Sequence, residues 1–258
     1  MIRIKIIVNC GPCEEYIDKC ICSVREQSWS NWDAFVTVDP CGDRSYTVAQ
    51  KAAAGDSRFH LRRNKTRRYS MHNLIRAIAC SRAEPEDVIV CLDGDDWFAH
   101  RDALSRIVDA YRDPDCWVTY GSWLSNVPGP SGRPNGAWPA YPEGDVDFRR
   151  HRFLGTAVRT WKKWLWDHLR DDDLRNESGD YARVSEDQLI MIPLLEMCGT
   201  AHARHIAEPI MIYNKLVRYS PDDSITREGE RNGHLIDSRQ PYPRLAHKSY
   251  RRKRAAAV

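Results

Sequence analysis

The chain has no long hydrophobic run, no strong excess of charge and no internal repeat. No apolar stretch approaches the roughly 18 residues of a membrane-spanning helix, so an integral membrane protein is not expected. Its 39 Lys and Arg against 36 Asp and Glu give a net charge of +3, which argues against a dedicated nucleic-acid binder. Because 42% of its 258 residues are hydrophobic, a largely disordered chain is excluded as well.

A secretion signal is also missing from the sequence. The apolar part of the opening MIRIKIIVNC is too short for one and has no cleavage site after it. The nine cysteines are an odd number, so at least one thiol stays unpaired, and disulfides are not expected without secretion. We therefore expect a cytoplasmic protein.

Short apolar strands alternate with helical patterns in the first half of the chain. This alternation predicts an α/β fold, a Rossmann-like and mainly parallel central sheet flanked by helices. The run at 88–92 is apolar throughout, as in a strand that is buried on both faces. The expected strands are 2–8, 34–38, 58–61, 88–92 and 117–120, and the expected helices begin at Glu14 and cover 71–81 and 103–111.

The second half is less regular. Residues 127–144 are rich in proline and glycine and predict a long loop. After about residue 217 the sequence turns polar and ends in bases, which favours one domain over 1–217 with an extension at 218–258. Helices are expected at 160–169 and 186–198, and a late strand at 206–213.

The strongest local motif is an acidic turn after the buried strand, Leu92-Asp93-Gly94-Asp95-Asp96-Trp97. Ligands of open α/β sheets bind beyond the carboxyl ends of strands, where this turn lies. Like charges this close are unfavourable unless a cation compensates them. The oxygen ligands of Asp93 and Asp95 therefore predict a site for Mg²⁺ or Mn²⁺ that can bridge to a diphosphate, although Asp-Gly is also a common turn sequence.

Two further acidic positions have both a functional and a structural interpretation. Asp39 ends the second strand, where its carboxylate can accept a hydrogen bond from a nucleotide or simply begin a turn. Glu186 and Asp187 follow Ser185 at the start of a helical pattern. They can cap that helix, or they can supply a general base that points into a cleft.

Taken in order, these features resemble family 2 glycosyltransferases, which have the GT-A fold and invert the configuration of the transferred sugar. The stretch YIDKCICSVREQSW from Tyr16 is similar to the family's Y-I-x-x-C-I-x-S-V-x-x-Q-T-Y helix. The strand that ends at Asp39, the strand that ends in Asp93-Gly94-Asp95-Asp96, and the Glu186-Asp187 pair follow in the family's order. The resemblance covers about residues 2 to 215.

The resemblance implies a metal-dependent transfer of sugar from a nucleoside-diphosphate sugar to an acceptor hydroxyl. Asp187 is then the general base. Asp95 is the main ligand of Mn²⁺ or Mg²⁺, with Asp93 on the metal or the ribose. The implied donor-binding residues are Asn9, Asp39, Arg68 with its neighbours Arg63 and Arg67, Asn73, Asp93, Gly94, Arg159 and Glu186. The acceptor is left open between a glycan, a lipid-linked glycan and a protein, and no nucleic acid is expected.

Some positions depart from the family pattern. The family has Asp-Asp-Gly-Ser after its second strand, whereas this chain has Asp39-Pro40-Cys41-Gly42, with Asp43 as a substitute for the second acid. His205 and His234 are the candidates for a third metal ligand. Near Arg159, three tryptophans at 161, 164 and 166 can stack on a sugar or pack a helix.

Two other functions compete with this interpretation. Cys10-Gly11-Pro12-Cys13 has the spacing of a thioredoxin-like redox motif, but Asn9 replaces the usual Trp and the rest of the chain is then unexplained. Zinc binding by these cysteines with Cys20 and Cys22 is disfavoured, because residues two apart on a helix face different directions. A non-catalytic nucleotide-sugar-binding module is the second alternative.

The basic C-terminal tail carries Arg244, Lys248 and 251–254 with no acid among them. Such a tail can contact an anionic membrane surface, which suits an enzyme acting on a lipid-linked glycan. It can equally be a disordered, solubilising end, which we favour. The oligomeric state and the sugar are not predicted.

Overall fold

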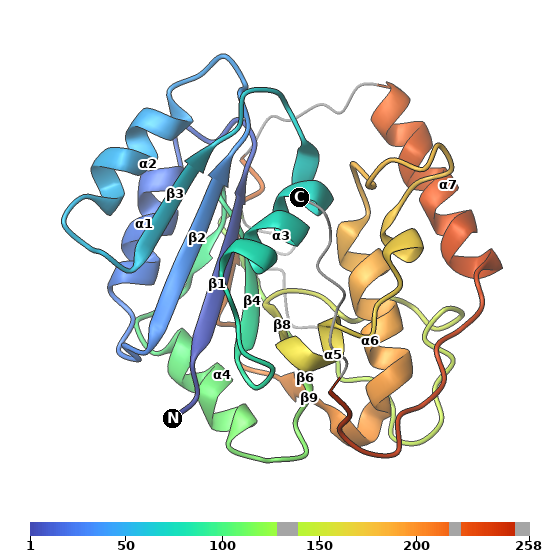
Figure 1. The fold of residues 1–258 in the computed structure, drawn as a ribbon. Coiled ribbons are helices and arrows are strands. Elements are labelled where there is room, and N and C mark those ends of the chain that lie inside the picture. The colour runs from blue at the N-terminus through green and yellow to red at the C-terminus, as the bar shows by residue number, and fades with distance from the viewer. Residues whose placement is uncertain (128–138, 217–222, 251–258) are drawn as a thin grey trace.

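The computed structural model describes residues 1–127, 139–216 and 223–250, and a twisted sheet runs through its centre (Figure 1). In this part of the chain the sheet has seven strands in the order β3-β2-β1-β4-β8-β6-β9. All neighbours are parallel except β8, which is antiparallel to both β4 and β6. The strands are β1 (Ile4–Cys10), β2 (Trp32–Val38), β3 (Phe59–Arg63), β4 (Val88–Asp93), β6 (Val118–Gly121), β8 (Arg159–Lys162) and β9 (Ala203–Ile206).

Helices cover both faces of this sheet because its central strands are apolar on both sides. Successive side chains of a strand point to opposite faces. Ile6 and Val8 therefore pack with α1, α2 and α4, whereas Ile7 and Ile89 pack with α3, α5, α6 and α7. The helices are α1 (Ile17–Arg25), α2 (Ser45–Ala53), α3 (Tyr69–Cys80), α4 (Ala103–Tyr111), α5 (Lys163–Trp166), α6 (Glu186–His202) and α7 (Asp223–Ser238), with a short 3₁₀ turn at Asp171–Leu174. The predicted α/β architecture is confirmed.

The register of the central strands brings three chain segments to one edge. Asn9 of β1 lies beside Asp93 of β4, and Cys10 lies beside Val38 of β2. The residues that follow these strands therefore meet at the carboxyl edge of the sheet, where α/β folds bind ligands. A small sheet of β5 (Trp97–Phe98), β10 (Met211–Tyr213) and β7 (Leu124–Ser125) continues this edge.

The second half of the chain corrects several expectations. The helix expected at 160–169 is wrong at its start, because β8 occupies Arg159–Lys162 and only the short α5 follows. The expected late strand is instead two strands, β9 and β10, which lie in different sheets. The helix expected at 186–198 is confirmed as α6, which includes Pro193. Most of the long loop expected at 127–144 lies outside the described residues.

The C-terminal region contains a helix that the sequence pattern did not reveal. Ile236 of α7 and Tyr242 are buried in the same core as α3 and α6. In Figure 1 this helix runs beside α6 on the right of the molecule. Of the basic tail, Arg244 pairs with Asp145 and Lys248 with Glu86, while 251–254 lie outside the described residues. No helix in the described ranges is long and apolar enough to cross a membrane.

Candidate active site

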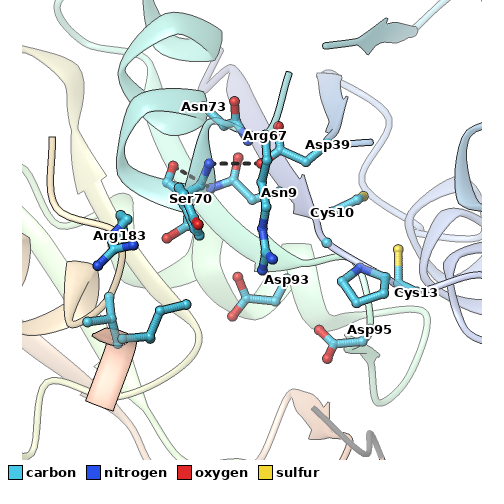
Figure 2. A pocket seen from close by; sticks show the side chains of 15 residues that line it. Asn9, Cys10, Cys13, Asp39, Arg67, Ser70, Asn73, Asp93, Asp95 and Arg183 are labelled. Carbon is cyan, nitrogen blue, oxygen red and sulfur yellow. Dashed lines mark hydrogen bonds between the residues drawn. The ribbon is translucent and has the colours of Figure 1, made fainter. Parts of the chain in front are cut away.

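A cleft of about 250 Å³ opens at the carboxyl edge of the sheet. Figure 2 shows side chains from several elements converging on it. The ends of β1 and β4 supply Asn9, Asp93 and Asp95, and the turn after β2 supplies Asp39. Because strand register fixes these positions, the cleft is largely preformed by the fold.

Asp39 is held by the protein itself. Its Oδ1 accepts a hydrogen bond from the Asn64 side chain at 2.8 Å. Its Oδ2 accepts the backbone N–H groups of Arg68 at 3.0 Å and Tyr69 at 2.8 Å, which lie at the start of α3. A carboxylate at a helix N-terminus satisfies free N–H groups. Asn64 also donates to Asn73 Oδ1 at 2.7 Å, so one buried network joins β2 to α3.

Three carboxylates crowd the turn after β4. Burial and the charge of Asp93 raise the pKa of Asp95 to about 6. Burial, with the charges of Asp93 and Asp95, raises the pKa of Asp96 to about 8. Asp96 is used structurally, because it accepts the backbone N–H of Asn214 at 2.8 Å and ties the turn to the small sheet. Asp93 and Asp95 remain to face the cleft.

This pair of carboxylates fits a divalent metal ion. Mg²⁺ in proteins is commonly held by one or two carboxylates plus substrate phosphates and water. The charge of Asp93 raises the pKa of Asp95, and a cation between the two carboxylates would relieve this repulsion. No group of three or more His, Cys, Asp and Glu placed to hold a metal is found in the described residues. His205 lies against the ring of Tyr120, and His234 is exposed on α7.

A second cluster of charged side chains, from β8 and α6, lies beside the cleft. Arg159 pairs with Asp93 at 3.7 Å between Nη2 and Oδ2. Burial alone would lower the pKa of Arg159, but the charges of Asp93, Asp187 and Glu186 raise it overall. Burial and the charge of Asp93 raise the pKa of Glu186 to about 8. Asp187 is more exposed than Glu186, and its charge acts on both Asp93 and Arg159.

Some polar atoms at the cleft have no hydrogen-bond partner among the described residues. They are Asn9 Oδ1, from a residue that lines the cleft, and Arg159 Nε and Glu186 Oε2, from residues that are not among the lining residues; all three atoms are buried. Buried polar atoms are nearly always paired in folded proteins, so unpaired ones call for a ligand or water. The predicted residues Glu186 and Asp187 begin α6, where Ser185 is in the left-handed region and its side chain forms no capping hydrogen bond.

The arginines that line the cleft are not the one that the sequence analysis preferred for donor binding. Arg67 lines the cleft, and Arg68 contributes its backbone N–H to Asp39 but is not among the lining residues. Arg183, which sequence reasoning missed, lines the opposite side (Figure 2). The only signal for it was its position two residues before Ser185. Ile225 of α7 also lines the cleft, and no sequence pattern indicated it.

Cys10 and Cys13 line the cleft as free thiols. A hydrogen bond to Cys13, together with burial, raises the pKa of Cys10 well above its ordinary value. A redox-active thiol needs the opposite shift. Cys10 instead packs against the acidic turn after β4, because a Cβ at Gly94 would come within 2.5 Å of its sulfur.

The three tryptophans near Arg159 do not reach the cleft. Trp161, Trp164 and Trp166 are 1%, 1% and 2% exposed, and all belong to the core. Of the two alternatives, stacking on a sugar and packing within the fold, the structure supports the second. Their apolar rings pack between β8, β6 and α6, which is the ordinary role of a buried Trp.

The parallel sheet and the acidic cleft at its carboxyl edge define a GT-A type of α/β protein. The glycosyl transferase family 2 model matches residues 5–165, which is more than half of the chain. The chain therefore belongs to glycosyl transferase family 2, and a thioredoxin-like protein is ruled out. No curated protein matches it closely enough to count as a relative.

Solved structures with the same fold include one protein from S. aureus and one from Pyrobaculum calidifontis. S. aureus TarS 1–349 in complex with UDP superposes with a TM-score of 0.61 at 15% identity, covering 83% of this chain and 60% of that one. The mannosyltransferase PcManGT from Pyrobaculum calidifontis, in complex with GDP-Man and Mn²⁺, gives 0.56 at 16% identity, covering 82% and 56%. The chain thus spans less than two thirds of the length of each.

Proposed function

We propose that the chain is a metal-dependent, inverting glycosyltransferase that uses a nucleoside-diphosphate sugar. Membership of family 2 supports transfer of a sugar. One observation carries the donor site: Asp93 and Asp95 face a cleft that also holds Arg67, Arg183 and the unpaired Asn9 Oδ1. Carboxylates for a cation, arginines for phosphates and an amide for a ribose or base are the groups that such a donor needs.

Asp93 and Asp95 would hold the Mn²⁺ or Mg²⁺. When bound, the ion neutralises the charge that develops on the leaving diphosphate. Arg67 lines the cleft and would hold the phosphate oxygens, because a guanidinium binds such oxygens in pairs, whereas Arg183 is already paired with Glu228. The Asp39 network fixes the start of α3, so that Ser70 and Asn73 keep their places in the cleft wall.

Asp187 is the proposed general base. It is the more exposed member of the Glu186-Asp187 pair and lies near Asp93 and Arg159. An ionised carboxylate there accepts the proton of the acceptor hydroxyl as the oxygen attacks the anomeric carbon from the side opposite the diphosphate. Glu186, with its pKa raised to about 8, holds a proton at neutral pH and would donate a hydrogen bond in the site.

A panel of nucleotide sugars, each with Mn²⁺, tests this proposal by release of nucleoside diphosphate. The expected result is turnover of one donor by the wild type and a loss of roughly 10² to 10⁴-fold in Asp187→Asn. Proton NMR of the product checks inversion at the anomeric carbon. Equal turnover in both proteins would refute the role of Asp187. Binding of nucleotide without turnover of any donor would indicate a non-catalytic binding module instead.

A further inference from the structure

A second pocket, of about 240 Å³, lies beside the donor cleft. The turn at 176–180 forms one wall and α7 forms the other. Arg183 lines both the pocket and the donor cleft, so the two are neighbours. Every residue of this pocket follows residue 165, where the match to the family model ends. The pocket therefore belongs to the part of the chain that the family model does not cover.

Among the described residues, every one that lines the pocket has a polar or charged side chain. Described residues that line it include Asn176, Asp180, Arg183, Glu228, Arg231 and Asn232. Pockets for drug-sized ligands are mostly apolar, which this pocket is not. A small pocket with mixed donors and acceptors matches a sugar unit, because each hydroxyl both donates and accepts hydrogen bonds.

The charges in the pocket disfavour an anion. Glu228 accepts hydrogen bonds from the backbone N–H of Arg183 at 2.8 Å and from its Nε at 2.5 Å, so this arginine is already neutralised. Arg231 faces Glu177 at 3.8 Å. Asp180 then remains as an acid with no cation beside it among the described residues. A phosphate or a lipid headgroup would meet a net negative wall, whereas a neutral polyol would not.

One buried atom in the pocket wall points to a ligand independently. Asn232 is 0% exposed, and its Oδ1 has no hydrogen-bond partner among the described residues. Its Nδ2 donates to the carbonyl oxygen of Val184 at 3.0 Å. The same side chain thus holds the segment that leads to Asp187 and keeps one acceptor unpaired at the pocket.

We propose that this pocket binds a neutral sugar unit of the acceptor, next to the segment that carries Asp187. The inference rests on the proposed transferase function and narrows its acceptor to a carbohydrate. Since Asn232 of α7 donates to the carbonyl oxygen of Val184, a ligand in the pocket acts on the backbone three residues before Asp187. The pocket then selects the acceptor, while the family 2 region binds the donor.

Saturation-transfer NMR without any nucleotide tests the pocket directly. The probes are methyl glycosides of glucose, galactose, mannose and N-acetylglucosamine, with glucose 6-phosphate as the anionic comparison. At least one neutral glycoside should bind the wild type, and its Kd should rise tenfold or more in Asp180→Ala. Glu230→Gln, an exposed change on α7 outside the pocket, should keep the Kd within twofold.

A second measurement follows the same variants with an active donor. The ratio of transfer to hydrolysis should fall at least tenfold in Asp180→Ala and stay constant in Glu230→Gln. Failure of every glycoside to bind, equal binding by both variants, or preference for the phosphorylated sugar would overturn the inference. If glycosides bind in the pocket but no donor is turned over, the proposed function fails while the pocket stands as a sugar site.

Discussion

The two halves of the molecule build the cleft in different ways. In the first half, Asn9, Asp39, Asp93 and Asp95 come from the ends of neighbouring parallel strands, and strand register sets their positions. In the second half, side chains are placed by long-range contacts, such as Arg183 with Glu228, which is 45 residues away. The difference teaches that side chains at strand ends can be predicted from local pattern, whereas the positions of Arg183 and its neighbours depend on how distant segments pack.

The largest effect should come from the first half. Asp95→Asn removes one of the two carboxylates that face the cleft, and with it several kcal/mol of charge stabilisation through the metal ion. Sugar transfer should fall roughly 10³-fold, since each 1.36 kcal/mol is a factor of ten. Steady-state kinetics with saturating Mn²⁺ measures this. Asp109→Asn, an exposed acid on α4, is the matched control and should leave the rate unchanged.

A change in α7 tests whether the last region is part of the same folding unit. Ile236 is 6% exposed in the core shared with α3 and α6. Ile236→Ala should lower the free energy of unfolding by about 2–5 kcal/mol in a single transition, because it leaves a cavity. Urea unfolding measures it, with the exposed neighbour variant Asp237→Ala as control. An unchanged main transition would show an independent extension.

The acidic turn after β4 should tolerate no side chain at Gly94. The added methyl of Gly94→Ala would lie 2.5 Å from the sulfur of buried Cys10. We expect a loss of about 1–3 kcal/mol in stability from this overpacking. The double variant Cys10→Ala/Gly94→Ala should recover part of the loss in thermal unfolding. If the double variant lost as much stability as the two single variants together, this contact would be contradicted.

The smallest effect concerns pH. The pKa of Glu186 is raised to about 8 in the fold from an ordinary value of 4.5, so the native state holds its proton where the unfolded state has lost it. Its stabilising contribution is complete below about pH 4.5 and is lost as the pH rises through 8. Over one pH unit, from 6 to 7, the wild type should lose stability relative to Glu186→Gln by up to about 1.4 kcal/mol.

Urea unfolding at several pH values measures this difference between the two proteins. Glu230→Gln on the surface of α7 is the control, and its difference from the wild type should not change with pH. If the free energies of unfolding of the wild type and of Glu186→Gln changed with pH in parallel, Glu186 would stay ionised beside Arg159.

Sequence patterns predicted the strands of the first half because each is a short apolar run with a turn after it. The acidic turn after β4 was recognised for the same reason. By contrast, residues 160–162 were predicted as the start of a helix, whereas they belong to β8, a strand of only four residues. The helix α7 has few apolar residues, and its burial depends on contacts such as Asn232 with Val184. Contacts between distant segments leave no local pattern.

The candidate site also combines residues that local patterns predicted with residues that only the structure revealed. Asp93, Asp95 and Asn9 were predicted and lie in the cleft, whereas Arg183 and Ile225 were found only in the structure. Asp39 was predicted to contact a nucleobase, and both of its carboxylate oxygens accept hydrogen bonds from the protein. A sequence shows which residue type follows a strand, but not which groups of the protein already form hydrogen bonds with that residue.

Calorimetric titration of nucleoside diphosphates tests the central claim most directly. UDP, GDP, ADP and CDP are titrated into the wild type and Asp95→Asn, each with and without Mn²⁺. The account predicts that one nucleotide binds the wild type at least tenfold more tightly with Mn²⁺ and that Asp95→Asn loses this gain. Binding that is equal with and without Mn²⁺ in the wild type, or no binding of any nucleotide, would contradict it.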